Sequence, residues 1–171
     1  MEREEIKTSK KEIVDYWFSR VNESGLSVDA AEAHERCWRC GCKRSLERCH
    51  IIPATVGGGD KASNLVLLCR RCHVENPNVS DPEIMWDWLR AYGTPFYDTF
   101  WLIQGAKEYE FIYKKSLEEE LRVREITDID KFKRIVQEEI QKTTFHFGHP
   151  YLNSGTLAGV FRIALQKYKR E

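Results

Sequence analysis

Hydrophobic residues near the start of the chain recur three and four positions apart. Residues 10–21 follow this spacing, which predicts an amphipathic helix. Ser27 or Asp29 could then begin a second short helix that runs into Cys37, because both side chains are good N-caps. Residues 1–36 are therefore expected to form an N-terminal helical segment.

The pattern changes over residues 37–77, where short apolar runs alternate with turn residues. The runs at 45–52 and 64–69 predict two strands, and residues 70–76 predict about two helical turns. Residues 55–63 contain three consecutive glycines and an aspartate, so they are expected to form a loop without regular structure. This part of the chain thus predicts a compact module of two strands and a helix.

Helical spacing returns in residues 78–171. Residues 95–124 and 129–142 place apolar positions among charged ones, and a break is expected near Gly105. The expected helix starts are Asp81-Pro82 and, for a last helix with a basic end, Asn153 or Ser154. The fold class predicted is α+β, with the small module embedded in a mainly helical scaffold.

Charge is balanced over the whole chain but unevenly distributed along it. The sequence carries 27 basic and 27 acidic side chains. Residues 37–73 nevertheless hold 7 basic and 2 acidic side chains, and residues 131–171 hold 8 and 3. A phosphate backbone responds to such local patches. Both blocks are candidates for contact with nucleic acid, although ordinary solvated surfaces can look the same.

The sequence lacks the features of a secreted or membrane-embedded chain. It contains no apolar run of about 18 residues, and its charged first residues lack the apolar core of a signal peptide. A cytoplasmic, reducing location is therefore expected, without a membrane partner. In that setting cysteines bind metals more often than they form disulfides.

Four of the six cysteines form two pairs with two residues between the partners. The pairs are Cys37/Cys40 and Cys69/Cys72, whereas Cys42 and Cys49 stand outside them. Two such pairs are typical of a closed, structural Zn²⁺ site, which would supply much of the folding free energy of so small a module. The alternative is four reduced cysteines packed as small hydrophobic residues.

Three further residues of the module stand out in combination. Alone, His50 would be a core histidine, Asn64 a turn residue and His73 a helix-end residue. With the cysteine pairs, the His-Ile-Ile-Pro strand end, the glycine loop and the final Cys-x2-Cys-His, they resemble the HNH nuclease motif, or ββα-metal (His-metal) finger. The resemblance covers residues 37–76 and implies a zinc-stapled ββα-metal module.

The resemblance also implies roles for these residues. His50 would be the general base that takes a proton from the attacking water. His73 would bind one catalytic divalent ion, such as Mg²⁺, Mn²⁺ or Ni²⁺. Asn64 would pin the loop that holds His50, and Gly57 to Gly59 would let a phosphate approach the backbone.

One residue departs from the motif. HNH nucleases commonly carry Asp or His just before the general base, as a second ligand of the catalytic ion, and here that residue is Cys49. A thiolate is a poor ligand for Mg²⁺ and a better one for softer ions. Three readings stay open: Cys49 ligates a softer metal, His73 and the phosphate hold the ion, or Cys49 is a packed strand residue.

The implied function is that of a metal-dependent endonuclease that cuts DNA, taken as double-stranded, in a restriction or defence setting. Arg48, Arg70 and Arg71 lie beside the site and could hold the substrate backbone, although each could equally be solvated surface. The C-terminal region is the candidate for target binding. A homodimer is a further hypothesis, since one HNH site cuts one strand. The rival interpretations are a non-catalytic zinc module that binds nucleic acid or protein, and a nuclease directed at RNA.

Overall fold

The computed structural model describes residues 6–91, 93–94, 96–145 and 151–168. It is a mixed α+β fold that divides into two compact units, residues 1–100 and residues 101–171. Within the described ranges, no helix is both long and apolar enough to cross a membrane. The predicted fold class is confirmed.

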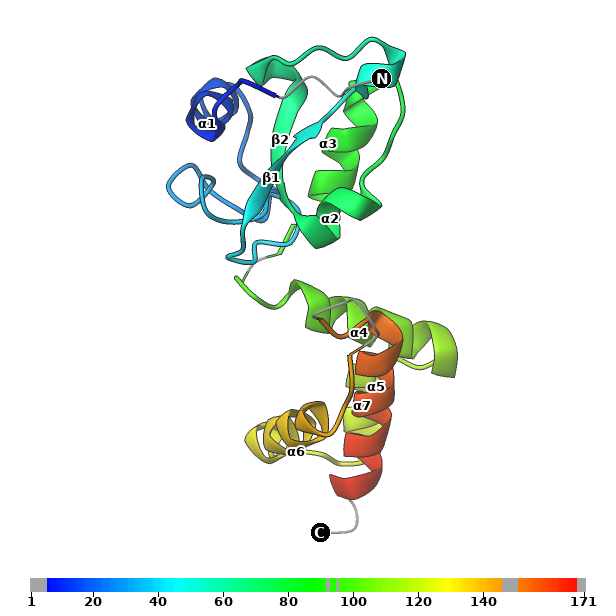
Figure 1. The fold of residues 1–171 in the computed structure, drawn as a ribbon. Coiled ribbons are helices and arrows are strands. Elements are labelled where there is room, and N and C mark those ends of the chain that lie inside the picture. Colours follow the sequence, from blue (N-terminus) through cyan, green and yellow to red (C-terminus); the bar gives the residue numbers. More distant parts are fainter. Residues whose placement is uncertain (1–5, 92, 95, 146–150, 169–171) are drawn as a thin grey trace. The chain divides into compact units, whose positions relative to one another are not determined.

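The first unit contains a two-stranded antiparallel sheet and short helices. Its elements are α1 (Lys10–Phe18), β1 (Leu46–His50), the 3-10 turns Ala54–Val56 and Ala62–Asn64, β2 (Leu65–Cys69), α2 (Arg70–Glu75) and α3 (Pro82–Arg90). In Figure 1 the two strands run beside each other, and α2 continues directly from the end of β2. The predicted helix in 10–21, both strands and the helix in 70–76 are confirmed.

The sheet register decides which side chains meet at the site. Leu46 pairs with Cys69 at one end, and His50 pairs with Leu65 at the other. All residues of β2 are buried, because α1 packs against this strand. The indole nitrogen of Trp17 donates to the carbonyl of Leu65 over 2.8 Å, which fixes α1 to the start of β2.

The second short helix predicted before Cys37 is wrong. Residues 30–35 form turns instead. The side chain of Ser27 is buried and caps no helix: its hydroxyl donates to the carbonyl of Arg39 and accepts from the backbone N–H of Thr94. The carboxylate of Asp29 does accept from the N–H of Glu32 over 3.1 Å, but the local hydrogen bonds that follow close only turns and no helix.

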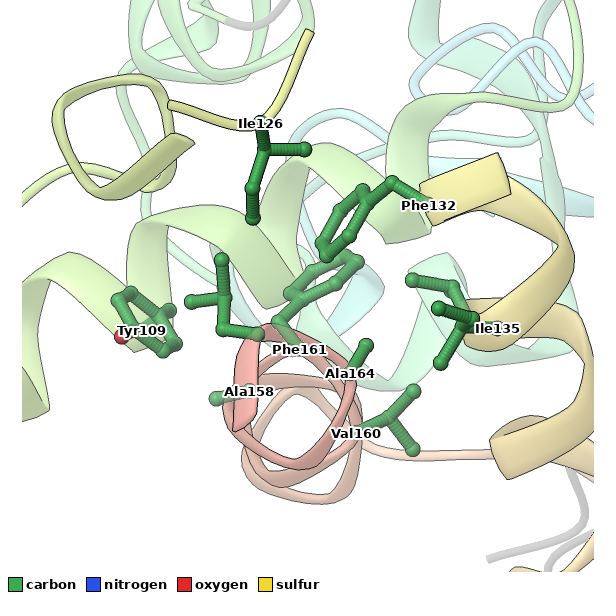
Figure 2. Close-up of a cluster of buried hydrophobic side chains, with 10 residues drawn as sticks. Tyr109, Ile126, Phe132, Ile135, Ala158, Val160, Phe161 and Ala164 are labelled. Carbon is green, nitrogen blue, oxygen red and sulfur yellow. The ribbon is translucent and has the colours of Figure 1, made fainter. Parts of the chain in front are cut away.

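The second unit is helical. Its helices are α4 (Phe100–Tyr113), which begins at the boundary of the two units, α5 (Leu117–Val123), α6 (Ile129–Gln141) and α7 (Ser154–Tyr168). Figure 2 shows side chains of α6 and α7, among them Phe132, Ile135 and Phe161, meeting in one hydrophobic cluster. The predicted helix start at Asn153 is confirmed, because its side chain accepts from the N–H of Thr156. The predicted basic end of the last helix includes Lys169 and Arg170, which lie outside the described residues.

The break predicted near Gly105 is wrong, since α4 runs through this residue. A Cβ at Gly105 would come within 2.5 Å of the Cβ of Leu157 on α7. The glycine therefore permits close packing of two helices rather than ending one of them. The helix ends instead at Tyr113, and the next residue, Lys114, turns the chain with a φ of 57°.

Candidate functional site

The two cysteine pairs come together at one point in the first unit. The Sγ atoms of the four cysteines all lie within 4.8 Å of one another, and all four residues are buried. Tetrahedral zinc with Zn–S bonds of about 2.3 Å needs sulfur atoms roughly 3.8 Å apart. The Cys40 and Cys69 sulfur atoms are 3.9 Å apart. The cluster could therefore hold zinc in a closed site without much rearrangement.

A tight turn and a helix start position the four cysteines. The N–H of Gly41 donates to the carbonyl of Cys37, and Gly41 has a φ of 68°, which reverses the chain between the first pair and Cys42. Cys69 ends β2 and Cys72 lies in the first turn of α2. The structural metal would therefore join the loop before β1 to the helix that carries His73.

Arg39 is a buried cation beside the cysteine cluster. Its guanidinium lies 3.9 Å from the Sγ of Cys72 and 2.5 Å from a carboxylate oxygen of Glu75. It also stacks over the rings of Trp88 and Phe100. A zinc ion bound by four thiolates would carry a net negative charge, part of which this cation would offset. The ion pair of Arg39 with Glu75 also joins α2 to the loop that carries Cys37 and Cys40.

His50 ends β1 and is half-buried. Burial lowers the pKa of His50 below its ordinary value, and the positive charge of a protonated His73 lowers it further, while Asp60 partly opposes this shift. The imidazole is therefore neutral near pH 7 and able to accept a proton.

Asn64 clamps the two ends of the glycine loop together. Its side-chain Oδ1 accepts from the N–H of Ile52 at 2.9 Å, and its Nδ2 donates to the carbonyls of Ile52 and Gly59 at 3.0 Å each. The main chain adds a bond from the N–H of Ile51 to the carbonyl of Asn64. This clamp begins immediately after His50 and so fixes the end of β1.

Gly58 is the glycine on which the clamp depends. A Cβ at this residue would lie 1.7 Å from the carbonyl oxygen of Ile52 and 2.8 Å from Nδ2 of Asn64. Gly57 has a φ of 93°, so it supplies the left-handed turn, whereas a Cβ at Gly59 would meet only the side chain of Lys61. The three glycines therefore differ in what they contribute.

We expect Gly58→Ala to destabilise the first unit by about 1–3 kcal/mol, because the Ile52 carbonyl must move away from the new methyl group. Gly59→Ala is the matched control and should stay within about 0.5 kcal/mol of wild type. Chemical denaturation of the three proteins measures both effects. Equal stability of the two variants would contradict this account of the loop.

His73 lies on α2 and contacts a residue that the sequence analysis did not single out. Its Nδ1 is 2.6 Å from Oε2 of Glu47 on β1. The contact arises because the register places the start of β1 beside the end of β2, from which α2 folds back. The pairing depends on that register, so no local sequence signal could have revealed it.

Cys49 is almost completely buried, with 1% of its surface exposed. Burial raises the pKa of its thiol to about 12, so the thiol is neutral, and its Sγ lies 3.6 Å from the carbonyl of His50. Among the described residues, the four-cysteine cluster is the one group of three or more donors close enough to share an ion, and Cys49 is outside it.

The three arginines beside the site have different surroundings. Arg48 donates to the carbonyl of Thr8, and Arg71 is buried. The side chain of Arg70 is 78% exposed and has one nitrogen 3.6 Å from Glu47. Of these arginines, Arg70 is the one most open to a ligand.

The N-terminal segment also reaches the site. The N–H of Lys7 donates to the carboxylate of Asp60 over 2.7 Å, next to the glycine loop. The hydrogen bond from Arg48 to Thr8 fixes the same segment to β1. Residues far apart in sequence therefore support the loop that follows His50.

Comparison with known proteins identifies this part of the chain. Residues 35–78 match the family model described as HNH endonuclease. Searches of curated proteins and of solved structures found no significant match. The predicted resemblance is confirmed: residues 35–78 carry an HNH endonuclease domain, with a four-cysteine cluster that fits zinc knuckles.

Proposed function

We propose that this protein is a metal-dependent endonuclease that hydrolyses phosphodiester bonds of DNA. The HNH match supports a nuclease-type function. The observation that carries the proposal is a half-buried His50 whose pKa is lowered by burial, at a strand end that the Asn64 clamp holds. A histidine in this state can accept a proton at neutral pH.

In the proposed reaction, His50 takes a proton from water as the water oxygen attacks phosphorus in line. The bond between phosphorus and the 3′-oxygen breaks, which leaves a 5′-phosphate and a 3′-hydroxyl after protonation by solvent. A divalent ion held through His73 would stabilise the charge on the phosphate and leaving oxygens. Asn64 acts indirectly, because it holds the backbone beside the base.

The residues present fit an ion with few protein ligands. His73 is partly exposed, whereas Cys49 is buried with its sulfur against the backbone carbonyl of His50. Water and the substrate phosphate would complete the coordination, as is usual for Mg²⁺. The domain thus supplies a base, one nitrogen ligand and a rigid loop.

Further parts of the proposal concern partners and setting. The surplus of basic side chains in residues 37–73, including the exposed Arg70, favours a phosphate-rich partner such as double-stranded DNA. We propose that the C-terminal region binds the target and that the protein has a restriction or defence role. We also propose that two copies form a homodimer, in which each site cuts one strand of the duplex. We also assign the protein to the cytoplasm, where cysteine pairs bind metals more often than they form disulfides.

Plasmid nicking tests the proposed function. Wild type should convert supercoiled DNA to open circles with Mg²⁺, Mn²⁺ or Ni²⁺ and should leave it intact in metal-free buffer. RNA of matching sequence, offered in parallel, should stay uncut. If wild type and His50→Ala give the same background in every metal, the protein is instead a non-catalytic zinc module that binds nucleic acid or protein. Cutting of RNA alone would point to the RNA-directed alternative.

A further inference from the structure

Glu47 and His73 form a pair on the surface of the HNH domain. Their side chains are 37% and 31% exposed, and Nδ1 of His73 lies 2.6 Å from Oε2 of Glu47. A nitrogen of Arg70 lies 3.6 Å from the same oxygen. The pair joins β1 to α2, so the backbone of two elements holds it in place.

The chemistry of the pair fixes the protonation of the imidazole. An ionised carboxylate can only accept a hydrogen bond, so Nδ1 of His73 must donate. In the neutral ring Nε2 then carries the lone pair and is available to a metal ion. Carboxylates orient metal-binding histidines in this way in many proteins, and they also make the ring a better ligand.

Cys49 offers no comparable group. The motif places an acidic or imidazole ligand just before the general base, but here Cys49 is buried and its sulfur lies against the backbone carbonyl of His50. Glu47 comes two residues earlier on the same strand and is exposed. Where the motif usually has a carboxylate just before the base, this chain has the carboxylate of Glu47 two residues earlier, and it contacts His73.

We propose that Glu47 is the positioning residue of the catalytic ion site, where it holds His73 with Nδ1 protonated and directs Nε2 to the ion. This inference rests on the proposed nuclease function for its purpose. It nevertheless concerns ion binding and the tautomer of His73, and both can be measured without nucleic acid. In this arrangement Cys49 packs in the strand and binds no ion.

Mn²⁺ binding to the zinc-loaded, full-length protein tests the proposal through the electron paramagnetic resonance signal of free Mn²⁺. Glu47→Gln should raise the dissociation constant about 10- to 100-fold, the usual effect of removing such a carboxylate. Glu35→Gln is the matched control, since Glu35 pairs with Lys43 at 2.6 Å and is 34% exposed. That control and Cys49→Ser should bind as wild type does.

A second measurement separates positioning from direct ligation. Long-range ¹H–¹⁵N spectra should show His73 protonated at Nδ1 in wild type, and a tautomer mixture in Glu47→Gln. A shorter carboxylate in Glu47→Asp should give intermediate affinity.

Three results would overturn the proposal: no Mn²⁺ binding by wild type, unchanged affinity and tautomer in Glu47→Gln, or a loss of binding in Cys49→Ser. Failure of the nuclease proposal looks different. In that case wild type binds Mn²⁺ and shows the expected tautomer, yet cuts no DNA in any metal.

Discussion

Cys72→Ser should unfold the first unit of the protein. Cys72 is one of four buried cysteines whose sulfur atoms form the cluster, and it lies in the first turn of α2, the helix that carries His73. Structural zinc contributes about 10–16 kcal/mol in zinc-finger peptides, whereas whole domains are stable by about 5–15 kcal/mol. If loss of one thiolate releases the ion, the stability lost is therefore comparable to all that the unit has. Thermal unfolding and zinc content per chain measure the result.

Cys42→Ser is the control for this experiment. Cys42 is also buried and adjacent to the cluster, but its sulfur lies 3.7 Å from the carbonyl of Cys40 and outside the group of four. It should keep its zinc and its unfolding transition. The helices of the second unit have their own hydrophobic cluster and should retain helical signal in Cys72→Ser. Normal zinc content in Cys72→Ser would contradict the assignment of a structural zinc ion to the four cysteines.

His50→Ala should lower the rate of DNA cleavage by about 10²- to 10⁴-fold, the usual contribution of a general base. His50 is only half-buried at a strand end, so the variant should fold normally. The control is His34→Ala, which removes an exposed histidine of the same unit outside the HNH domain. Single-turnover rates at saturating metal compare the three proteins, and equal rates in wild type and His50→Ala would exclude His50 as the base.

The pH dependence of wild type gives an independent check on the base. Only neutral His50 accepts a proton, so the rate should rise as pH increases through its pKa. Burial lowers that pKa, so the rise should be centred below pH 6.5, the ordinary value for histidine. The residual rate of His50→Ala should not show this rise with pH. A rise centred above pH 7 would contradict the environment described for the side chain.

Sequence predicted the elements of the HNH domain well because their signals are local. The short apolar run that ends at Cys69 predicts a strand, and the residues after it predict a helix start, as the structure has them. The glycine loop is equally local, although short 3-10 turns occupy its two ends. The cluster of four cysteines followed from their spacing, since two knuckles in one small module can share one ion.

Long-range contacts were beyond the reach of such signals. Glu47 looked like an ordinary strand residue until the register brought it to His73. Arg71 looked available to nucleic acid, yet it is buried on α2. Gly105 looked like a helix breaker because its partner, Leu157, lies more than fifty residues away. In each case a neighbour distant in sequence decides the role of the residue.

The surroundings of Arg39 bear on how this domain could be moved between proteins. The family match ends at residue 78, but the rings over which Arg39 stacks belong to Trp88 and Phe100. A graft of the matched segment alone would expose the Arg39 guanidinium to solvent. It would also lack Trp17, whose indole donates to the carbonyl of Leu65 on β2. The smallest piece suited to transplantation into a chimaera is therefore the whole first unit, residues 1–100.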